Sequence, residues 1–81
     1  MKKIYSKDFT KYFQKLDAKT KERVWEAIQL LPEGQYIRLK GKRIPPIFRI
    51  RVGKYRILFK MDESTISIIE IDSRGDIYKS I

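Results

Sequence analysis

The fold is decided by the stretch Ile47–Met61, which reads IFRIRVGKYRILFKM. Apolar residues recur at every second position through Ile47–Val52 and again through Tyr55–Met61, which is the period of β-strands with one buried face. Gly53 and Lys54 separate the two runs and suit a two-residue hairpin turn with glycine at its first position. The stretch therefore predicts an antiparallel β-hairpin on which the rest of the chain must pack.

The register of this hairpin gathers three arginines on one face. With a two-residue turn, Arg51 lies opposite Arg56, and Arg49 shares their face because side chains alternate along a strand. Like charges opposite each other in a sheet cost about 0.2–1 kcal/mol, whereas a phosphate between them would be bound by both. We predict an anion site here; the alternative is that the arginines only keep an open face soluble, with their stems covering Leu58. The other face, predicted to lie under helices, carries Phe48, Ile50, Val52, Tyr55, Ile57 and Phe59.

Positive charge is concentrated in and just before the hairpin. The chain has 19 lysines and arginines, 10 aspartates and glutamates and a net charge of +9, and the segment from Arg38 to Lys60 contains no acidic residue. Clustered basic charge is typical of nucleic-acid-binding surfaces. A solvated surface, an acidic protein partner or an anionic membrane would also fit the charge alone. The further candidate RNA contacts are Arg38, Lys40, Lys42, Arg43 and Lys54.

Two amphipathic helices are predicted before the hairpin. Lys2–Tyr5 predicts a short first strand, Ser6 is placed to cap the first helix, and Asp17 is placed to cap the second. Pro32 and Gly34 end the second helix. The spacing i, i+3, i+4, i+7 predicts a buried stripe on each helix. The stripes are Phe9, Tyr12, Phe13 and Leu16 in the first helix and Val24, Ala27, Ile28 and Leu31 in the second.

Two more strands are predicted after the hairpin, an internal one over Thr65–Ile71 and a short one over Asp76–Ser80. The element order predicts an α+β fold in which an N-terminal strand and a two-helix hairpin pack on one face of a twisted antiparallel sheet. Residues 1–81 are expected to form one domain.

The composition excludes several kinds of chemistry. The chain has no cysteine and no histidine, so it cannot build a thiol nucleophile, a zinc knuckle or a Ser-His-Asp triad. Its glycines form no phosphate-binding loop, and its carboxylates show no metal-ligand spacing. We expect no cofactor and no metal. Without a long apolar run or a signal peptide, we expect a cytoplasmic protein with no membrane partner.

The hairpin and the chain end resemble the RelE/ParE superfamily of bacterial and archaeal toxins. The resemblance rests on Leu39–Gly41, on the motif Arg-x-Arg-x-Gly-x-Tyr-Arg from Arg49 to Arg56, and on Ile71–Lys79, and with the helices it covers nearly the whole chain. It implies the fold described above and a ribosome-dependent messenger-RNA endonuclease that cleaves the codon in the A site. The ribose 2′-hydroxyl attacks the adjacent phosphate without a metal ion.

The resemblance also implies roles for individual residues. Arg49 and Arg51 match a basic pair at the scissile region, and Arg56 matches an arginine that stabilises the phosphate. Arg74 matches one that assists the leaving group, and Tyr78 a tyrosine that orients the nucleotide. Some relatives carry lysine at the first two positions, where it serves as a general base. Because arginine stays protonated, we expect these two to stabilise charge only, and we expect no cleavage of free RNA.

The partners implied are the ribosome, messenger RNA and a RelB-like antitoxin whose acidic helix wraps the basic surface. Two other functions remain open on the same residues. One is a ParE-like toxin that inhibits DNA gyrase without cutting RNA. The other is a non-catalytic RNA- or ribosome-binding module.

Overall fold

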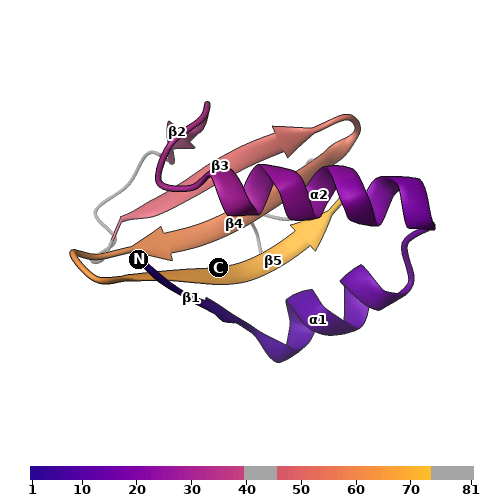
Figure 1. The fold of residues 1–81 in the computed structure, drawn as a ribbon, viewed down its shortest axis with the longest axis horizontal. Helices are drawn as coiled ribbons and strands as arrows, with labels where there is room; N and C mark the ends of the chain where they lie inside the picture. The colour runs from indigo at the N-terminus through magenta and orange to yellow at the C-terminus, as the bar shows by residue number, and fades with distance from the viewer. Residues whose placement is uncertain (40–45, 74–81) are drawn as a thin grey trace.

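The structure, a computed structural model, describes residues 1–39 and 46–73. These residues form two helices packed on one face of a five-stranded sheet (Figure 1). The predicted α+β class and the placement of both helices on one sheet face are confirmed. The elements are β1 (Lys2–Tyr5), α1 (Lys7–Gln14), α2 (Ala18–Leu30), β2 (Ile37–Arg38), β3 (Ile47–Val52), β4 (Tyr55–Met61) and β5 (Thr65–Asp72).

The sheet is mixed, with the strand order β1-β5-β4-β3-β2. Strands β2 to β5 pair antiparallel, but β1 runs parallel to β5, so the prediction of a purely antiparallel sheet was wrong. The direction of an edge strand depends on how the helices return the chain to the sheet, which no local pattern encodes. The short strand β2 was not predicted. The predicted last strand, Asp76–Ser80, lies outside the described residues.

Both predicted helix caps are present. Ser6 has extended backbone angles, and its hydroxyl oxygen accepts a hydrogen bond from the Phe9 N–H at 3.0 Å. Asp17 accepts from the Thr20 N–H at 3.3 Å. Each side chain satisfies a backbone donor that has no partner within its helix. The helices run in opposite directions across the sheet (Figure 1).

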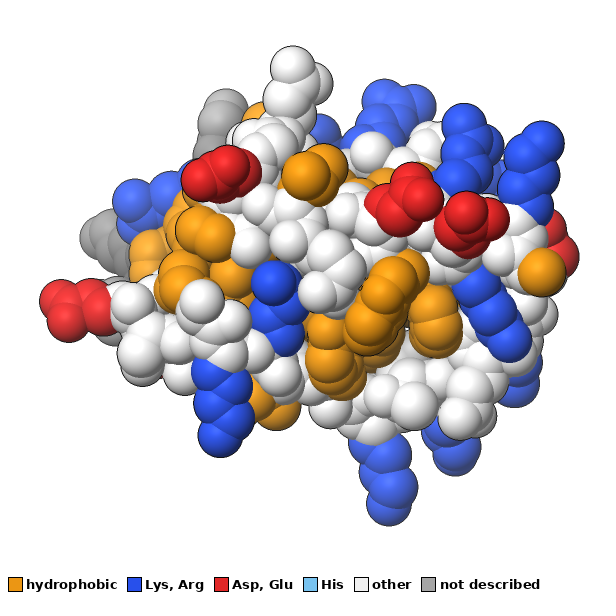
Figure 2. All heavy atoms as spheres, viewed as in Figure 1, with side chains coloured by type: hydrophobic (Ala, Val, Ile, Leu, Met, Phe, Trp, Pro, Cys, Tyr) orange, Lys and Arg blue, Asp and Glu red, His pale blue; other side chains and the backbone are white. Residues whose placement is uncertain are grey.

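The predicted helical stripes form the inner surface of both helices. Phe9, Leu16, Val24, Ile28 and Leu31 are buried, and they join sheet residues in one apolar core. Tyr12, Phe13 and Ala27 are half-buried against that core. Helix α1 ends at Gln14, so Leu16 reaches the core from the turn that follows. On the helix side of the molecule, groups of apolar side chains reach the surface among both basic and acidic side chains (Figure 2).

Ser6 also ties the first helix to the sheet. Its N–H donates to the Ile68 carbonyl at 2.9 Å, and its hydroxyl donates to the Ile69 carbonyl. The half-buried Ser6 side chain therefore caps the N-terminus of α1 and also forms a hydrogen bond to a backbone carbonyl of β5.

We expect Ser6→Ala to lower the free energy of unfolding by about 1–2 kcal/mol, because both the cap and the bond to β5 are lost. Urea denaturation followed by circular dichroism would measure the change. Ser6→Thr keeps the hydroxyl and should recover most of the stability. A Ser6→Ala variant as stable as the wild type would contradict this role.

Hydrogen bonds lower the pKa values of two turn carboxylates. The Thr20 hydroxyl and N–H lower the pKa of Asp17, and the Ser64 and Thr65 N–H groups lower the pKa of Asp62. A carboxyl group with a lowered pKa in the folded state stabilises the protein near neutral pH. That contribution is lost as the pH falls through the folded pKa. Both carboxylates are part of the scaffold and lie outside the arginine face.

Within residues 1–39 and 46–73, no helix is long and apolar enough to cross a membrane.

Candidate nucleic-acid interface

The hairpin register matches the prediction. Arg51 lies opposite Arg56, and Arg49 lies opposite Leu58. Gly53 has φ 59°, the left-handed value that the first position of this two-residue turn requires. Arg49, Arg51 and Arg56 therefore share the sheet face opposite the helices, and we call these three residues the arginine face. Arg49 and Arg56 are half-buried, whereas Arg51 is exposed.

The arginine face has an apolar floor. Leu58 is 0% exposed and Ile47 is 3% exposed, and both belong to a second buried cluster against which Leu39 packs. Leu58 lies between Arg49 and Glu70 in the register of the sheet. Because Ile47 and Leu58 are buried and closely packed, the strand backbone that carries the arginines is rigid. The sheet thus carries packed apolar residues on both faces.

Two carboxylates from β5 join the same face, which the sequence analysis did not anticipate. Asp72 lies opposite Arg56, and Glu70 lies opposite Leu58. The basic segment has no acidic residue along the chain, but the sheet brings acidic neighbours to it. The face is therefore basic on β3 and β4 and acidic on β5.

The signal for these carboxylates was a break in the alternation of β5. Ile68 and Ile69 are consecutive apolar residues in a run that otherwise alternates from Ile66. The structure shows a register shift here: Phe59 pairs with Ile68, while Leu58 pairs with Glu70. Such a β-bulge moves the residues after it to the other face of the sheet.

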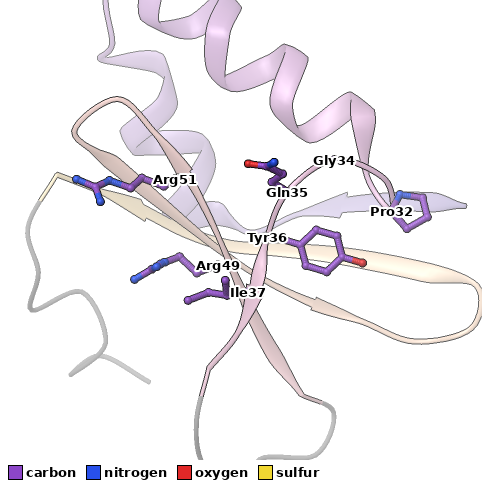
Figure 3. A pocket seen from close by; sticks show the side chains of 7 residues that line it. All are labelled: Pro32, Gly34, Gln35, Tyr36, Ile37, Arg49 and Arg51. Atoms are coloured by element: carbon purple, nitrogen blue, oxygen red, sulfur yellow. The ribbon is translucent and has the colours of Figure 1, made fainter.

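A groove opens along the outer edge of β3. It has a volume of about 590 Å³ and is lined by Pro32, Gly34, Gln35, Tyr36, Ile37, Arg49 and Arg51 (Figure 3). Two of the three face arginines thus also line a groove. Neither Gln35 nor Ile37 was predicted as a site residue, since a loop glutamine and an isolated apolar residue carry no distinctive pattern.

The other candidate contacts fall in different places. Arg38 is exposed on β2, but it lies opposite Phe48 and so belongs to the helix side of the sheet. Lys54 is exposed at the hairpin turn, with Nζ 5.5 Å from the centre of the Tyr55 ring. The remaining predicted site residues lie outside the described residues; they are Lys40, Lys42, Arg43, Arg74 and Tyr78.

The guanidinium groups of the arginine face have the chemistry to bind an anion. Two guanidinium groups opposite each other present planar N–H donors, which suit a phosphate better than ammonium groups do. Within residues 1–39 and 46–73, no three acidic side chains come together as a metal-binding group.

Family membership follows from the sequence as a whole. Residues 4–78 match the model of the family described as "ParE toxin of type II toxin-antitoxin system, parDE". The chain belongs to this toxin family. The toxin is accordingly a member of the RelE/ParE superfamily, as its hairpin motif predicted. No protein with a curated function matches its sequence.

Solved structures share the fold of the toxin. The archaeal RelE–RelB complex from Pyrococcus horikoshii OT3 matches with a TM-score of 0.77 and 23% identity over 91% of this chain and 94% of that one. The RelB–RelE complex from Methanococcus jannaschii matches with a TM-score of 0.74 and 24% identity over 96% and 98% of the two chains. The intact E. coli RelBE complex matches with a TM-score of 0.72 and 16% identity over 91% and 96%.

Proposed function

We propose that the toxin is a ribosome-dependent messenger-RNA endonuclease that blocks translation by cutting the codon in the A site. The observation that supports this most directly is the placement of Arg51 opposite Arg56, with Arg49 on the same face. A fold gains no stability from two like charges opposite each other, whereas a phosphate between them is bound by both. Asp72 lies opposite Arg56 on its other side, so the proposed phosphate site is the Arg51–Arg56 pair on β3 and β4 and not the whole face.

The proposed reaction is an internal transesterification. The ribose 2′-oxygen bonds to the adjacent phosphorus as its proton leaves, and the bond from phosphorus to the 5′-oxygen breaks. The products are a 2′,3′-cyclic phosphate and a 5′-hydroxyl, which receives a proton. Arg51 and Arg56 would stabilise the negative charge that grows on the phosphate oxygens. Because arginine does not give up its proton, the group that accepts the 2′-hydroxyl proton is not one of these arginines.

Two further roles rest on residues outside the described ones. We propose that Arg74 assists the leaving 5′-oxygen and that Tyr78 orients the nucleotide, as in the family motif that ends at Lys79. Lys40, Lys42, Arg43 and Lys54 are proposed as contacts to the RNA backbone. Arg38 was predicted as another, but it lies opposite Phe48 on the helix side of the sheet and so is not on the arginine face.

The proposed regulatory partner is a RelB-like antitoxin. Several structural neighbours are complexes of a RelE toxin with a RelB antitoxin. An acidic antitoxin helix would suit a chain of net charge +9 whose basic residues are clustered. We propose that such a helix covers the basic surface, and that the toxin acts in the cytoplasm, where ribosomes translate.

Primer extension on messenger RNA in a cell-free translation reaction tests the function. The wild type should create new 5′ ends inside codons, and Arg51→Ala and Arg74→Ala should lose most of them. Arg23→Ala, an exposed arginine of α2, is the matched control and should cut like the wild type. A wild-type toxin that leaves the messenger intact on translating ribosomes would overturn the proposal.

Binding to RNA should depend steeply on salt. For single-stranded RNA, the logarithm of the binding constant falls with the logarithm of the salt concentration, by about 0.7 for each phosphate neutralised. We expect Arg51→Ala to reduce this slope by about 0.7, and Arg23→Ala to leave it unchanged. Fluorescence anisotropy with a short RNA at several salt concentrations measures the slope. Equal slopes for the two variants would show that Arg51 does not contact the backbone.

A second candidate function is inhibition of DNA gyrase, which the match to the ParE family model favours. A gyrase supercoiling assay separates it from the first: inhibition with intact messenger would assign the toxin to the gyrase class. A third candidate is a non-catalytic RNA- or ribosome-binding module. Blocked translation with both intact messenger and active gyrase would identify it.

A further inference from the structure

The groove beside the arginine face lies where the short strand β2 ends and the edge of β3 is no longer paired by it. Strand β2 covers β3 only at Phe48 and Arg49, through pairs with Arg38 and Ile37. The chain that connects the end of α2 to Ile37 does not pair with β3. It lies across the groove from Arg51 (Figure 3). The groove of about 590 Å³ thus continues directly from the two arginines of β3.

The lining combines three kinds of chemistry. Arg49 and Arg51 bring guanidinium groups, and Gln35 brings an exposed amide, which both donates and accepts hydrogen bonds. Ile37 lies opposite Arg49 in the register and is 49% exposed, although it is a large apolar residue. In Figure 3, Ile37, Arg49 and Arg51 project to one side of the strands.

Tyr36 explains why the loop holds its shape. Its ring packs edge-on against Phe48 and Phe59, with centroid distances of 5.5 and 5.4 Å. Figure 3 shows this ring turned away from Ile37 and Arg49. Gln35 and Ile37 flank this anchor on either side in sequence, so their backbone positions beside the arginines are set before any ligand arrives.

We propose that this groove is a nucleotide subsite in which Arg49 and Arg51 bind a phosphate, Ile37 packs against the base, and Gln35 reads the edge of that base. The volume lies in the range of small-ligand sites, which is about 300–1,000 Å³. Proteins that recognise unpaired bases place them against apolar or aromatic side chains and hydrogen-bond their edges. An inorganic phosphate would use the guanidinium groups alone and would leave the amide and the apolar surface without a role.

This inference rests on the proposed function in one respect: within the endonuclease, the subsite would hold the nucleotide next to the scissile phosphate and bias which codons are cut. Gln35 is then a residue that determines specificity. It acts on the choice of base, whereas Arg56 acts on the reacting phosphate.

The first test is a binding experiment that needs no cleavage. Isotope-labelled toxin is titrated with each of the four ribonucleoside 5′-monophosphates and, separately, with inorganic phosphate. We expect the nucleotides to shift the amide signals of Gln35 and Ile37, and phosphate to shift chiefly those of Arg49 and Arg51. Gln35→Ala should weaken the preference among the four nucleotides. Nucleotide shifts identical to those of inorganic phosphate would overturn the proposal.

The second test uses the translation reaction, with every cut position mapped by sequencing. Gln35→Ala should change the relative use of codons by about fivefold or more, the size expected when one base-reading contact is lost. Gln14→Ala, an exposed glutamine at the end of α1, is the matched control and should keep the wild-type distribution. Unchanged codon use in Gln35→Ala would overturn the subsite. A wild-type toxin that binds nucleotides as described but cuts nothing would instead overturn only the endonuclease.

Discussion

Arg56→Ala is expected to lower the rate of messenger cleavage by about 10²–10³-fold, the usual loss when one preorganised donor to a transition-state oxyanion is removed. The variant should remain folded, because Arg56 is half-buried over the Leu58 floor and lies opposite another arginine. Removing it relieves a repulsion from Arg51 of about 0.2–1 kcal/mol but also removes the positive charge opposite Asp72, so we expect only a small net change in the free energy of unfolding. Single-turnover cleavage on programmed ribosomes measures the rate, and urea denaturation measures the stability.

Arg56→Lys separates charge from geometry at the same position. Lysine keeps the positive charge but cannot donate two parallel hydrogen bonds to one phosphate. We therefore expect an activity between those of the wild type and Arg56→Ala, with RNA binding close to that of the wild type. Full activity in Arg56→Lys would mean that only the charge is needed. Full activity in Arg56→Ala would remove this residue from the site.

Among the substitutions proposed for this protein, Phe59→Ala is expected to lower the free energy of unfolding most, by about 3–5 kcal/mol. Phe59 is 0% exposed, stacks on Phe48 with ring centroids 5.4 Å apart, and meets Tyr36 edge-on at 5.4 Å. The surrounding strands cannot close the cavity that the ring would leave, because they are fixed by the ladders on both sides of β4. For a domain of this size such a loss is a large part of the total stability, so the melting temperature should fall steeply.

Trp25→Ala is the matched comparison for Phe59→Ala. Trp25 is larger but is 45% exposed, and its ring stacks on Tyr5 with centroids 5.8 Å apart and lies 6.4 Å from the ring of Phe13. We expect Trp25→Ala to lower the free energy of unfolding by less than half as much as Phe59→Ala, since much of the Trp25 side chain already contacts water. Thermal melts followed by circular dichroism compare the two. If Phe59→Ala lowered the melting temperature less than Trp25→Ala, Phe59 would not be a central residue of the core.

The hairpin was predictable in full, including its residue bounds and register. Alternation on both sides of Gly53 and Lys54, broken only at Ile47 and Leu58, favours the pairing that places Phe48, Ile50 and Val52 on the same face as Tyr55, Ile57 and Phe59, and that pairing is the one observed. The helix caps at Ser6 and Asp17 were predictable for a similar reason, since a capping side chain acts on backbone groups within three residues of itself.

The candidate site was predictable only where it lies on that hairpin. Arg49, Arg51 and Arg56 come together through a local turn, so their placement needed no knowledge of the rest of the chain. Gln35 in the loop and Ile37 at the start of β2 reach the groove on either side of Tyr36, which packs on Phe48 and Phe59. Contacts between residues so distant in sequence leave no periodic signal.

The sequence by itself determined both helices, every described strand except β2, the turn between β3 and β4, and the face on which the arginines lie. All of these depend on side-chain periodicity and on bonds between near neighbours. The tertiary structure alone decided that β1 runs parallel to β5, and that the bulge beside Ile69 turns Glu70 and Asp72 toward the arginines. Without the bulge, Glu70 would share the buried face of Ile66 and Ile68. A bulge is chosen by the cost of burying charge and by the fit against β4, and both depend on the assembled sheet.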